Sequence, residues 1–143
     1  MEKHFLIAED DEEDIDLYKE AILAGALPIK VNFVLYCDGI FKTISVVPLP
    51  DLIIVDGNLP GKTLLECITE IRSHETLHRT PLVVLSGSSP KTFQAKSYDA
   101  GINLYLEKPN SLNEISELFK RLYYIDWSAN PKMSAEEFYA LNI

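Results

Sequence analysis

Five short apolar runs, each followed by a longer amphipathic or polar segment, constrain the fold of this chain more than any other feature. The runs lie at residues 5–8, 31–36, 52–55, 81–85 and 102–106. Each is too short for a stable helix, and an apolar run without alternation is typical of a strand buried on both faces. Strands that alternate with helices predict an α/β sandwich built on a parallel sheet.

The segments between the runs are predicted to be helices. Apolar residues recur at helical spacing in three of them, at positions 15, 18 and 22, at 64, 68 and 71, and at 115, 118, 122 and 125. A short helix is expected at 40–44, after a turn at Asp38-Gly39. Another is expected to run up to Ala100, where Gly101 ends it.

Three serines mark expected helix starts. Ser89 precedes Pro90, so Ser89 is the expected N-cap and Pro90 the first helical residue. Ser111 is followed three residues later by a glutamate, which is the pattern of a capping box. Ser134 and Glu137 have the same spacing and predict one short capped turn near the end of the chain.

Length and composition favour one globular domain. The chain has 143 residues, a 47% apolar fraction and a net charge of −9, and this charge disfavours binding to nucleic acid or an anionic membrane. We expect residues 1–127 to form the domain and 128–143 to form a tail too short for an output domain. Neither a signal peptide nor a membrane span is evident, so a cytoplasmic location is expected. Cys37 and Cys67 have no metal-binding spacing and are expected to be two reduced thiols.

Polar residues follow four of the five predicted strands. Glu9 and Asp10 follow the first, Asp56 and Asn58 the third, Ser86 the fourth and Lys108 the fifth. In the strand order 2-1-3-4-5 these four strand ends lie side by side, at the edge where doubly wound folds bind ligands. One pocket would then hold several carboxylates, one hydroxyl and one ammonium.

Such a pocket suits phosphoryl chemistry with Mg²⁺. Clustered carboxylates resist joint ionisation unless a cation lies among them, and without soft ligands a hard ion is favoured. Neither a GxxxxGK[ST] loop nor a GxGxxG fingerprint is present, so a bound nucleotide is not indicated. Asp56 is therefore the expected nucleophile. The acids at 11–16 are expected to be a solvated helix start, with the role of Asp11 open.

These residues closely resemble the receiver domain of bacterial two-component response regulators. The matching segments are Leu6–Asp11, Pro50–Pro60, Pro81–Ser86 and Tyr105–Pro109, and the likeness extends from about residue 4 to residue 125. The resemblance implies a flavodoxin-like receiver fold with strand order 2-1-3-4-5. It also implies that Asp56 accepts the phosphoryl group, Asp10 binds Mg²⁺ directly, Glu9 acts through water and Asn58 contributes its backbone carbonyl.

The resemblance assigns further roles on the other side of the acceptor. Lys108 would pair with the phosphoryl group, and Ser86 would hydrogen-bond to it and draw its loop inward. Tyr105 would be the aromatic switch that follows Ser86, and a cis peptide bond would precede Pro109. Gly57 and Gly87 depart from the residues usual in the family without removing a chemical group from the site.

Implied partners are a sensor histidine kinase or a histidine phosphotransfer protein. The signalling face would be the fourth helix, fifth strand and fifth helix, where a homodimer would also form. The aromatic ending at 123–127 and the absence of an output domain resemble single-domain regulators paired with bacterial phytochromes.

The main interpretation is a signalling phosphoacceptor, which is not an enzyme because it catalyses only its own phosphotransfer and dephosphorylation. Two alternatives belong to other functional classes. One is a receiver-like interaction module that is never phosphorylated, and the intact set of Asp10, Asp56, Ser86 and Lys108 argues against it. The other is an aspartate-nucleophile phosphohydrolase. Such enzymes use a second aspartate two residues after the nucleophile, where this chain has Asn58.

Overall fold

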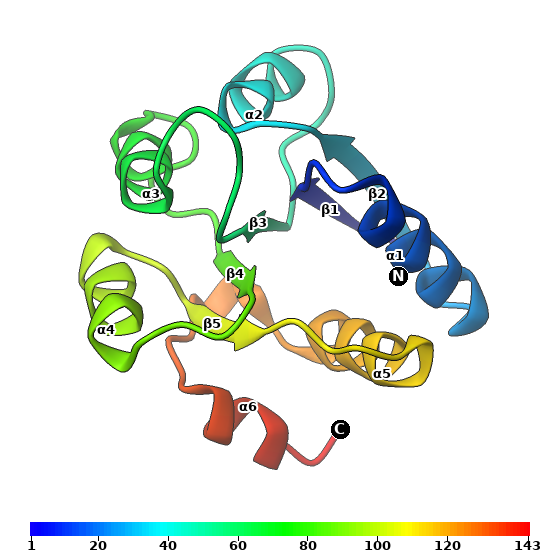
Figure 1. Cartoon of the computed structure of the whole chain (residues 1–143). Helices are drawn as coiled ribbons and strands as arrows, with labels where there is room; N and C mark the ends of the chain where they lie inside the picture. The colour runs from blue at the N-terminus through cyan, green and yellow to red at the C-terminus, as the bar shows by residue number, and fades with distance from the viewer.

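A parallel five-stranded sheet is the centre of the computed structural model, which describes all residues from 1 to 143 (Figure 1). The strands run in the order β2-β1-β3-β4-β5, and every neighbouring pair is parallel. This confirms the predicted α/β fold and strand order. The strands are β1 Lys3–Ala8, β2 Ile29–Val34, β3 Leu52–Asp56, β4 Leu82–Ser86 and β5 Leu104–Glu107.

Helices cover both faces of the sheet. The core packs α1 and α5 on one face and α2, α3 and α4 on the other, while α6 lies beside β5 (Figure 1). No helix combines the length and the apolar character that crossing a membrane requires. The helices are α1 Glu12–Ala24, α2 Cys37–Ile44, α3 Leu64–Ser73, α4 Lys91–Ala100, α5 Leu112–Tyr124, the 3₁₀ turn η1 Trp127–Ala129 and α6 Ala135–Ala140.

The core has two layers that share the strands. Phe5 and Ile7 face the α1–α5 layer, whereas Leu6 and Ala8 face the opposite layer. Every residue of β3 and β4 is buried. The continuous apolar runs thus follow from a sheet covered on both faces, since successive side chains point to opposite layers.

Cap residues match the sequence analysis at two of three helices. Ser111 accepts a hydrogen bond from the backbone N–H of Glu114, and Ser134 and Glu137 form a complete capping box. Ser89 was wrongly expected to be the cap of α4. Pro90 is the residue before α4 and makes no side-chain cap, because the Ser89 hydroxyl is engaged by Tyr105, whose hydroxyl lies 2.9 Å away.

The start of α2 also differs from the prediction. Asp38 and Gly39 were expected in a turn but belong to the first turn of α2. Gly39 is buried there, and a Cβ at this position would lie 2.8 Å from the Cβ of Val34. Close packing of α2 on the end of β2 therefore requires the glycine, and tertiary contact overrides its turn preference.

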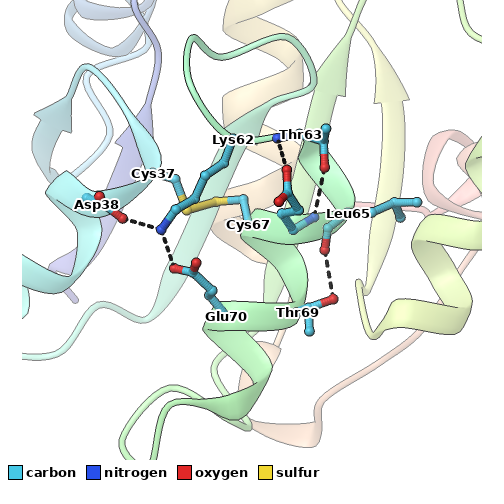
Figure 2. Close-up of a disulfide and its surroundings, with 9 residues drawn as sticks. Cys37, Asp38, Lys62, Thr63, Leu65, Cys67, Thr69 and Glu70 are labelled. Carbon is cyan, nitrogen blue, oxygen red and sulfur yellow. Dashed lines mark hydrogen bonds and ion pairs between the residues drawn. A yellow bond between two sulfur atoms is a disulfide. The ribbon is translucent and has the colours of Figure 1, made fainter.

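The two cysteines form a disulfide, contrary to the expectation of reduced thiols. Cys37 begins α2 and Cys67 lies in α3, with Cα atoms 5.9 Å apart despite a sequence separation of 30. Figure 2 shows the bridge beside Lys62, whose ammonium lies 2.5 Å from Asp38 and 2.6 Å from Glu70. A covalent bond and two ion pairs therefore join α2 to α3 across the fold, a proximity that cysteine spacing in the sequence does not reveal.

We predict that reducing this disulfide lowers the free energy of unfolding by about 3–4 kcal/mol, because a loop closed over 30 residues no longer restricts the unfolded chain. Urea unfolding with and without dithiothreitol measures the difference. The control is the Cys37→Ala/Cys67→Ala variant, whose stability should not respond to the reductant. An unchanged midpoint in wild type, with both thiols titrated as free, would contradict the prediction.

Candidate functional site

The carboxyl ends of β1, β3, β4 and β5 meet at one cleft of about 400 Å³. Glu9 and Asp10 follow β1, Asp56 ends β3 and Lys108 follows β5, as the strand order requires. The backbone N–H of Lys108 donates to the carbonyl of Ser86 at 2.7 Å, which continues the pairing of β4 with β5 into the site. The residues that line the cleft are Asp10, Asp11, Asp14, Asp56, Asn58, Gly87 and Lys108.

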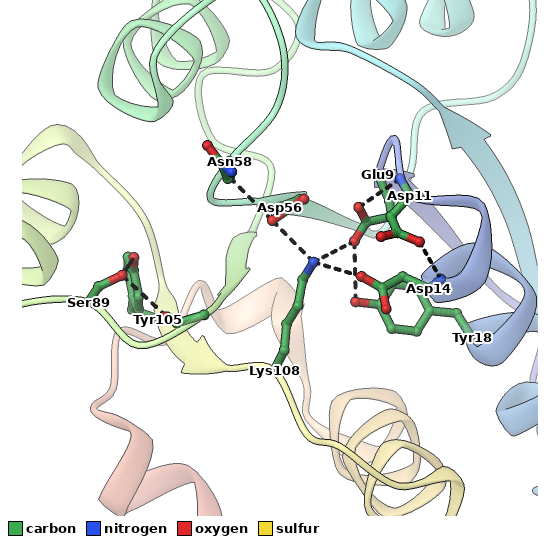
Figure 3. Close-up of polar contacts among 10 residues, drawn as sticks. Glu9, Asp11, Asp14, Tyr18, Asp56, Asn58, Ser89, Tyr105 and Lys108 are labelled. Atoms are coloured by element: carbon green, nitrogen blue, oxygen red, sulfur yellow. Dashed lines mark hydrogen bonds and ion pairs between the residues drawn. The ribbon is translucent and has the colours of Figure 1, made fainter.

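The ammonium of Lys108 is surrounded by three carboxylates (Figure 3). It lies 2.9 Å from Glu9 Oε1, 3.0 Å from Asp14 Oδ2 and 3.3 Å from Asp56 Oδ1. Glu9 is 1% exposed and Asp56 is 7% exposed. Carboxylates this buried need a partner cation, and Lys108 offsets part of the negative charge of the cluster.

Asp14 is a site residue that sequence reasoning missed. It was expected on the solvated start of α1, but its carboxylate reaches Lys108. The neighbouring Asp11 has a separate role as the N-cap of α1, where it accepts from the backbone N–H groups of Glu13 and Asp14. A cap at Asp11 places Asp14 at the third helical position, in the first turn of α1, which faces the cleft. The three-residue spacing between Asp11 and Asp14 is therefore a sequence feature from which the position of Asp14 near the cleft could have been predicted.

The charges in this cluster influence one another. The pKa of Glu9 is raised to about 7, mainly by burial and further by Asp56, while Lys108 opposes the rise. Burial alone would lower the pKa of the Lys108 ammonium, but its bonds to Glu9 and Asp14 outweigh burial, so the net shift is upward. The lysine therefore stays charged, and the acids around it compete for that single charge.

Three carboxylates fit a hard divalent cation. Single oxygens of Glu9, Asp10 and Asp56 all lie within 4.8 Å of one another. The backbone N–H of Asn58 donates to Asp56 Oδ1 at 3.2 Å, and this turn holds residue 58 beside the acceptor. Oxygen donors without sulfur or imidazole match the preference of Mg²⁺ or Mn²⁺. The direct, water-mediated and carbonyl roles expected for Asp10, Glu9 and Asn58 stay predictions.

Ser86 packs against the residue that follows Asp56. A Cβ placed on Gly57 would lie 2.6 Å from the Cβ of Ser86 and closer still to its hydroxyl. Gly57 is thus the residue that lets the ends of β3 and β4 approach each other. Its departure from the bulky residue usual in the family has a steric reason in this chain.

Tyr105 is buried, and its hydroxyl lies 2.9 Å from Ser89 Oγ rather than bonding to Ser86 (Figure 3). If Tyr105 acts as the predicted switch, its direct hydrogen-bond partner is therefore in the β4–α4 loop, residues 87–90. The peptide bond before Pro109 is trans, because the chain contains no cis peptide bond. The expected cis bond was wrong, and Lys108 reaches the carboxylates with the isomer that proline peptides ordinarily prefer.

Known proteins of one class share this fold. The family model for the response regulator receiver domain matches residues 5–120, so this chain belongs to the response regulator receiver family. Receiver domains of this family are signalling modules of two-component systems.

Particular relatives are response regulators, and one of the similar solved structures is that of a phytochrome response regulator. Response regulator Rcp1 of a Synechocystis strain is 29% identical over 81% of this chain and 83% of its own length. The crystal structure of the phosphorylated cyanobacterial phytochrome response regulator RcpA is similar with a TM-score of 0.75 and 32% identity, covering 85% of this chain and 91% of RcpA. The Mn²⁺-bound form of Rcp1 has a TM-score of 0.70 and 27% identity, covering 81% and 88%.

We predict that Gly57→Ala destabilises the protein by about 1–3 kcal/mol, since the added methyl group overlaps Ser86. Gly87→Ala is the matched control, because a Cβ there meets nothing within 4 Å. The Gly57→Ala/Ser86→Gly double variant should recover most of the loss. Chemical unfolding of the three variants measures the effect, and equal stabilities for Gly57→Ala and Gly87→Ala would refute the steric account.

Proposed function

We propose that this chain is a phosphoacceptor response regulator that takes a phosphoryl group on Asp56 with Mg²⁺ and signals by changing conformation. The observation that carries the proposal is the position of Lys108, whose ammonium lies 3.3 Å from the buried Asp56 carboxylate beside two further acids. This pairing sets a cation where the charge of a transferred phosphoryl group would develop.

In the proposed reaction an Asp56 oxygen attacks the phosphorus of a phosphohistidine. An O–P bond forms, the P–N bond breaks, and its electron pair leaves with the imidazole. A carboxylate nucleophile carries no proton, so the step needs no general base. Mg²⁺, held by Glu9, Asp10, Asp56 and the Asn58 carbonyl, would neutralise charge on the phosphoryl oxygens. Later attack by a water oxygen on phosphorus would form a new O–P bond, break the bond to Asp56 and release inorganic phosphate, which regenerates the Asp56 carboxylate.

Lys108 has to exchange partners in this reaction. In the structure its ammonium is shared among Glu9, Asp14 and Asp56. A phosphoryl group on Asp56 would bring new oxygens toward Lys108, and a divalent cation held near Glu9 would offset the charge of Glu9 that Lys108 now pairs with. The β4–α4 loop can then follow the phosphoryl group through Ser86, whose hydroxyl adjoins Gly57.

The proposed donor is a sensor histidine kinase or a histidine phosphotransfer protein. The likeness to the phytochrome response regulator RcpA makes a phytochrome-type kinase the first donor to test. A homodimer through the α4–β5–α5 face belongs to the proposal, as does a cytoplasmic location, where such kinases draw on ATP. Cytoplasmic thiols are usually kept reduced, so the redox state of Cys37 and Cys67 in cells bears directly on this location.

Incubation with acetyl phosphate and Mg²⁺ is expected to add one phosphoryl group to the intact protein. Asp56→Asn removes the nucleophile and should abolish the gain, while a chelator should suppress it in wild type. Intact mass spectrometry measures each state. If the wild type gains no mass and also fails to bind beryllofluoride, a stable phosphoryl mimic, the proposal is wrong and the chain is an unmodified interaction module.

We further predict that Asp14→Asn speeds phosphorylation by acetyl phosphate about two- to tenfold, because Lys108 no longer has to leave Asp14. Glu13→Gln is the matched control. It removes the same charge one residue away, on an exposed side chain that makes no ion pair with Lys108. Equal rates for the two variants would show that the Asp14–Lys108 pair does not restrain the reaction.

A further inference from the structure

The end of the chain lies against the surface to which signalling was assigned. Residues 130–143, here named the C-terminal segment, pass beside the edge strand β5 in the region between α4 and α5 (Figure 1). None of the acceptor chemistry requires this segment. Its contacts fall into three groups, on α5, on β5 and on α4.

Phe138 is the anchor on the α5 side. Its side chain is fully buried and belongs to the core layer shared with α1 and α5. Arg121 of α5 donates to the carbonyl oxygens of Phe138 at 3.3 Å and Leu141 at 2.9 Å, and its guanidinium lies 6.0 Å from the centre of the Tyr139 ring. One side chain of the face thus binds two carbonyl oxygens at the end of α6.

Asn103, just before β5, holds the start of the segment. Its buried amide nitrogen donates to Asn130 Oδ1 at 2.8 Å and to the carbonyl of Pro131 at 2.7 Å. The backbone N–H of Met133 donates to the carbonyl of Asn103 at 3.0 Å. The segment therefore takes up the backbone carbonyl and the side-chain amide of the residue that leads into the edge strand β5.

Tyr98 connects the segment to α4. Its hydroxyl donates to the carbonyl of Met133 at 2.7 Å and accepts from the backbone N–H of Tyr105 at 2.9 Å. The ammonium of Lys132 lies 5.9 Å from the centre of the Tyr98 ring. A single side chain of α4 thus joins β5 to the C-terminal segment.

Docking is the reason that α6 is ordered. The helix has 6 residues, whereas isolated helices of fewer than about 12–15 residues are marginal in water. When the Phe138 side chain leaves the core, α6 loses the buried apolar contact that stabilises it. Release is therefore an order-to-disorder transition, and a modest change in the face can shift its equilibrium.

The acceptor site is linked to this face through the β4–α4 loop. Ser89 in that loop is hydrogen-bonded to the Tyr105 hydroxyl at 2.9 Å, and the loop leads directly into α4. Only Ser97 of this helix is fully buried, while Phe93, Tyr98 and Ala100 pack partly exposed against the core. Helix α4 therefore has less buried contact than α3 or α5 to resist its movement. A loop drawn toward a phosphoryl group on Asp56 would pull Ser89 from Tyr105 and shift α4, together with Tyr98.

We propose that the C-terminal segment is an intramolecular plug that covers the α4–β5–α5 face while Asp56 is unmodified and leaves it when Asp56 is phosphorylated. The inference rests on the proposed phosphoacceptor function. It means that any partner, including a second copy of this chain, can use the whole face only after the segment has been released.

The test is amide hydrogen exchange of the full chain with Mg²⁺, with and without beryllofluoride. Exchange in residues 131–143 should rise about tenfold when the mimic is bound, as expected for an ordinary allosteric coupling. The bound fluorine resonance shows that the site is occupied. An occupied site with unchanged exchange in the segment overturns release. Absence of the bound fluorine resonance rejects the proposed phosphoacceptor function, and with it phosphorylation as the cause of release. Failure of the proposed function and failure of segment release therefore give different results.

The covering role has its own test. A labelled peptide of residues 131–143 should bind Phe138→Ala at least about tenfold more tightly than wild type, where the tethered segment competes at about millimolar effective concentration. Glu136→Ala, at an exposed residue of α6 whose side chain makes no ion pair or hydrogen bond with the face, is the matched control and should behave as wild type. Met133→Pro removes the hydrogen bond to Asn103 and keeps Phe138, in case the alanine variant does not fold. Equal peptide affinity for wild type and both release variants overturns the plug.

Discussion

The charge of Lys108 is the constraint on which the site depends. Glu9 and Asp56 are buried at the carboxyl end of the sheet, and without a cation such carboxylates would protonate or resist burial. Lys108 can supply that cation only because β5 lies beside β4, which aligns its backbone with Ser86. The chemistry of the site therefore depends on the strand order. The order of the strands places Lys108 beside the buried carboxylates, and its positive charge lowers the free-energy cost of burying them.

Much of the fold could be predicted from sequence because its signals are local. The continuous apolar runs of β3 and β4 reflect burial on both faces, and the helical stripes and the caps at Ser111 and Ser134 reflect contacts within a few residues. The strand ends were also predictable, since parallel strands carry their functional groups at one edge. Strand order itself came from family resemblance, because periodicity does not encode which strands are neighbours.

The features that escaped prediction depend on residues far apart in sequence. The Cys37–Cys67 bridge joins two helices that only the finished fold brings together. Ser89 has the right identity for a cap, but Tyr105 from another element takes its hydroxyl. Asp14 is a partial exception: a cap at Asp11 fixes its place in the helix, yet its contact with Lys108 requires knowing where β5 ends. Local rules fail where a distant partner offers a better contact.

The disulfide also changes what a cut in the chain would mean. The bridge closes a covalent ring that contains Asp56 and all of β3. The ring includes the exposed loop between α2 and β3, where Val46 is 81% exposed and Leu49 is 51% exposed, a typical place for proteolytic nicking. A protease that cut there would leave β1 and β2 covalently tied to the fragment bearing the acceptor. An oxidised, nicked molecule would therefore differ from the intact one only by an added water, and only reduction would separate its two pieces.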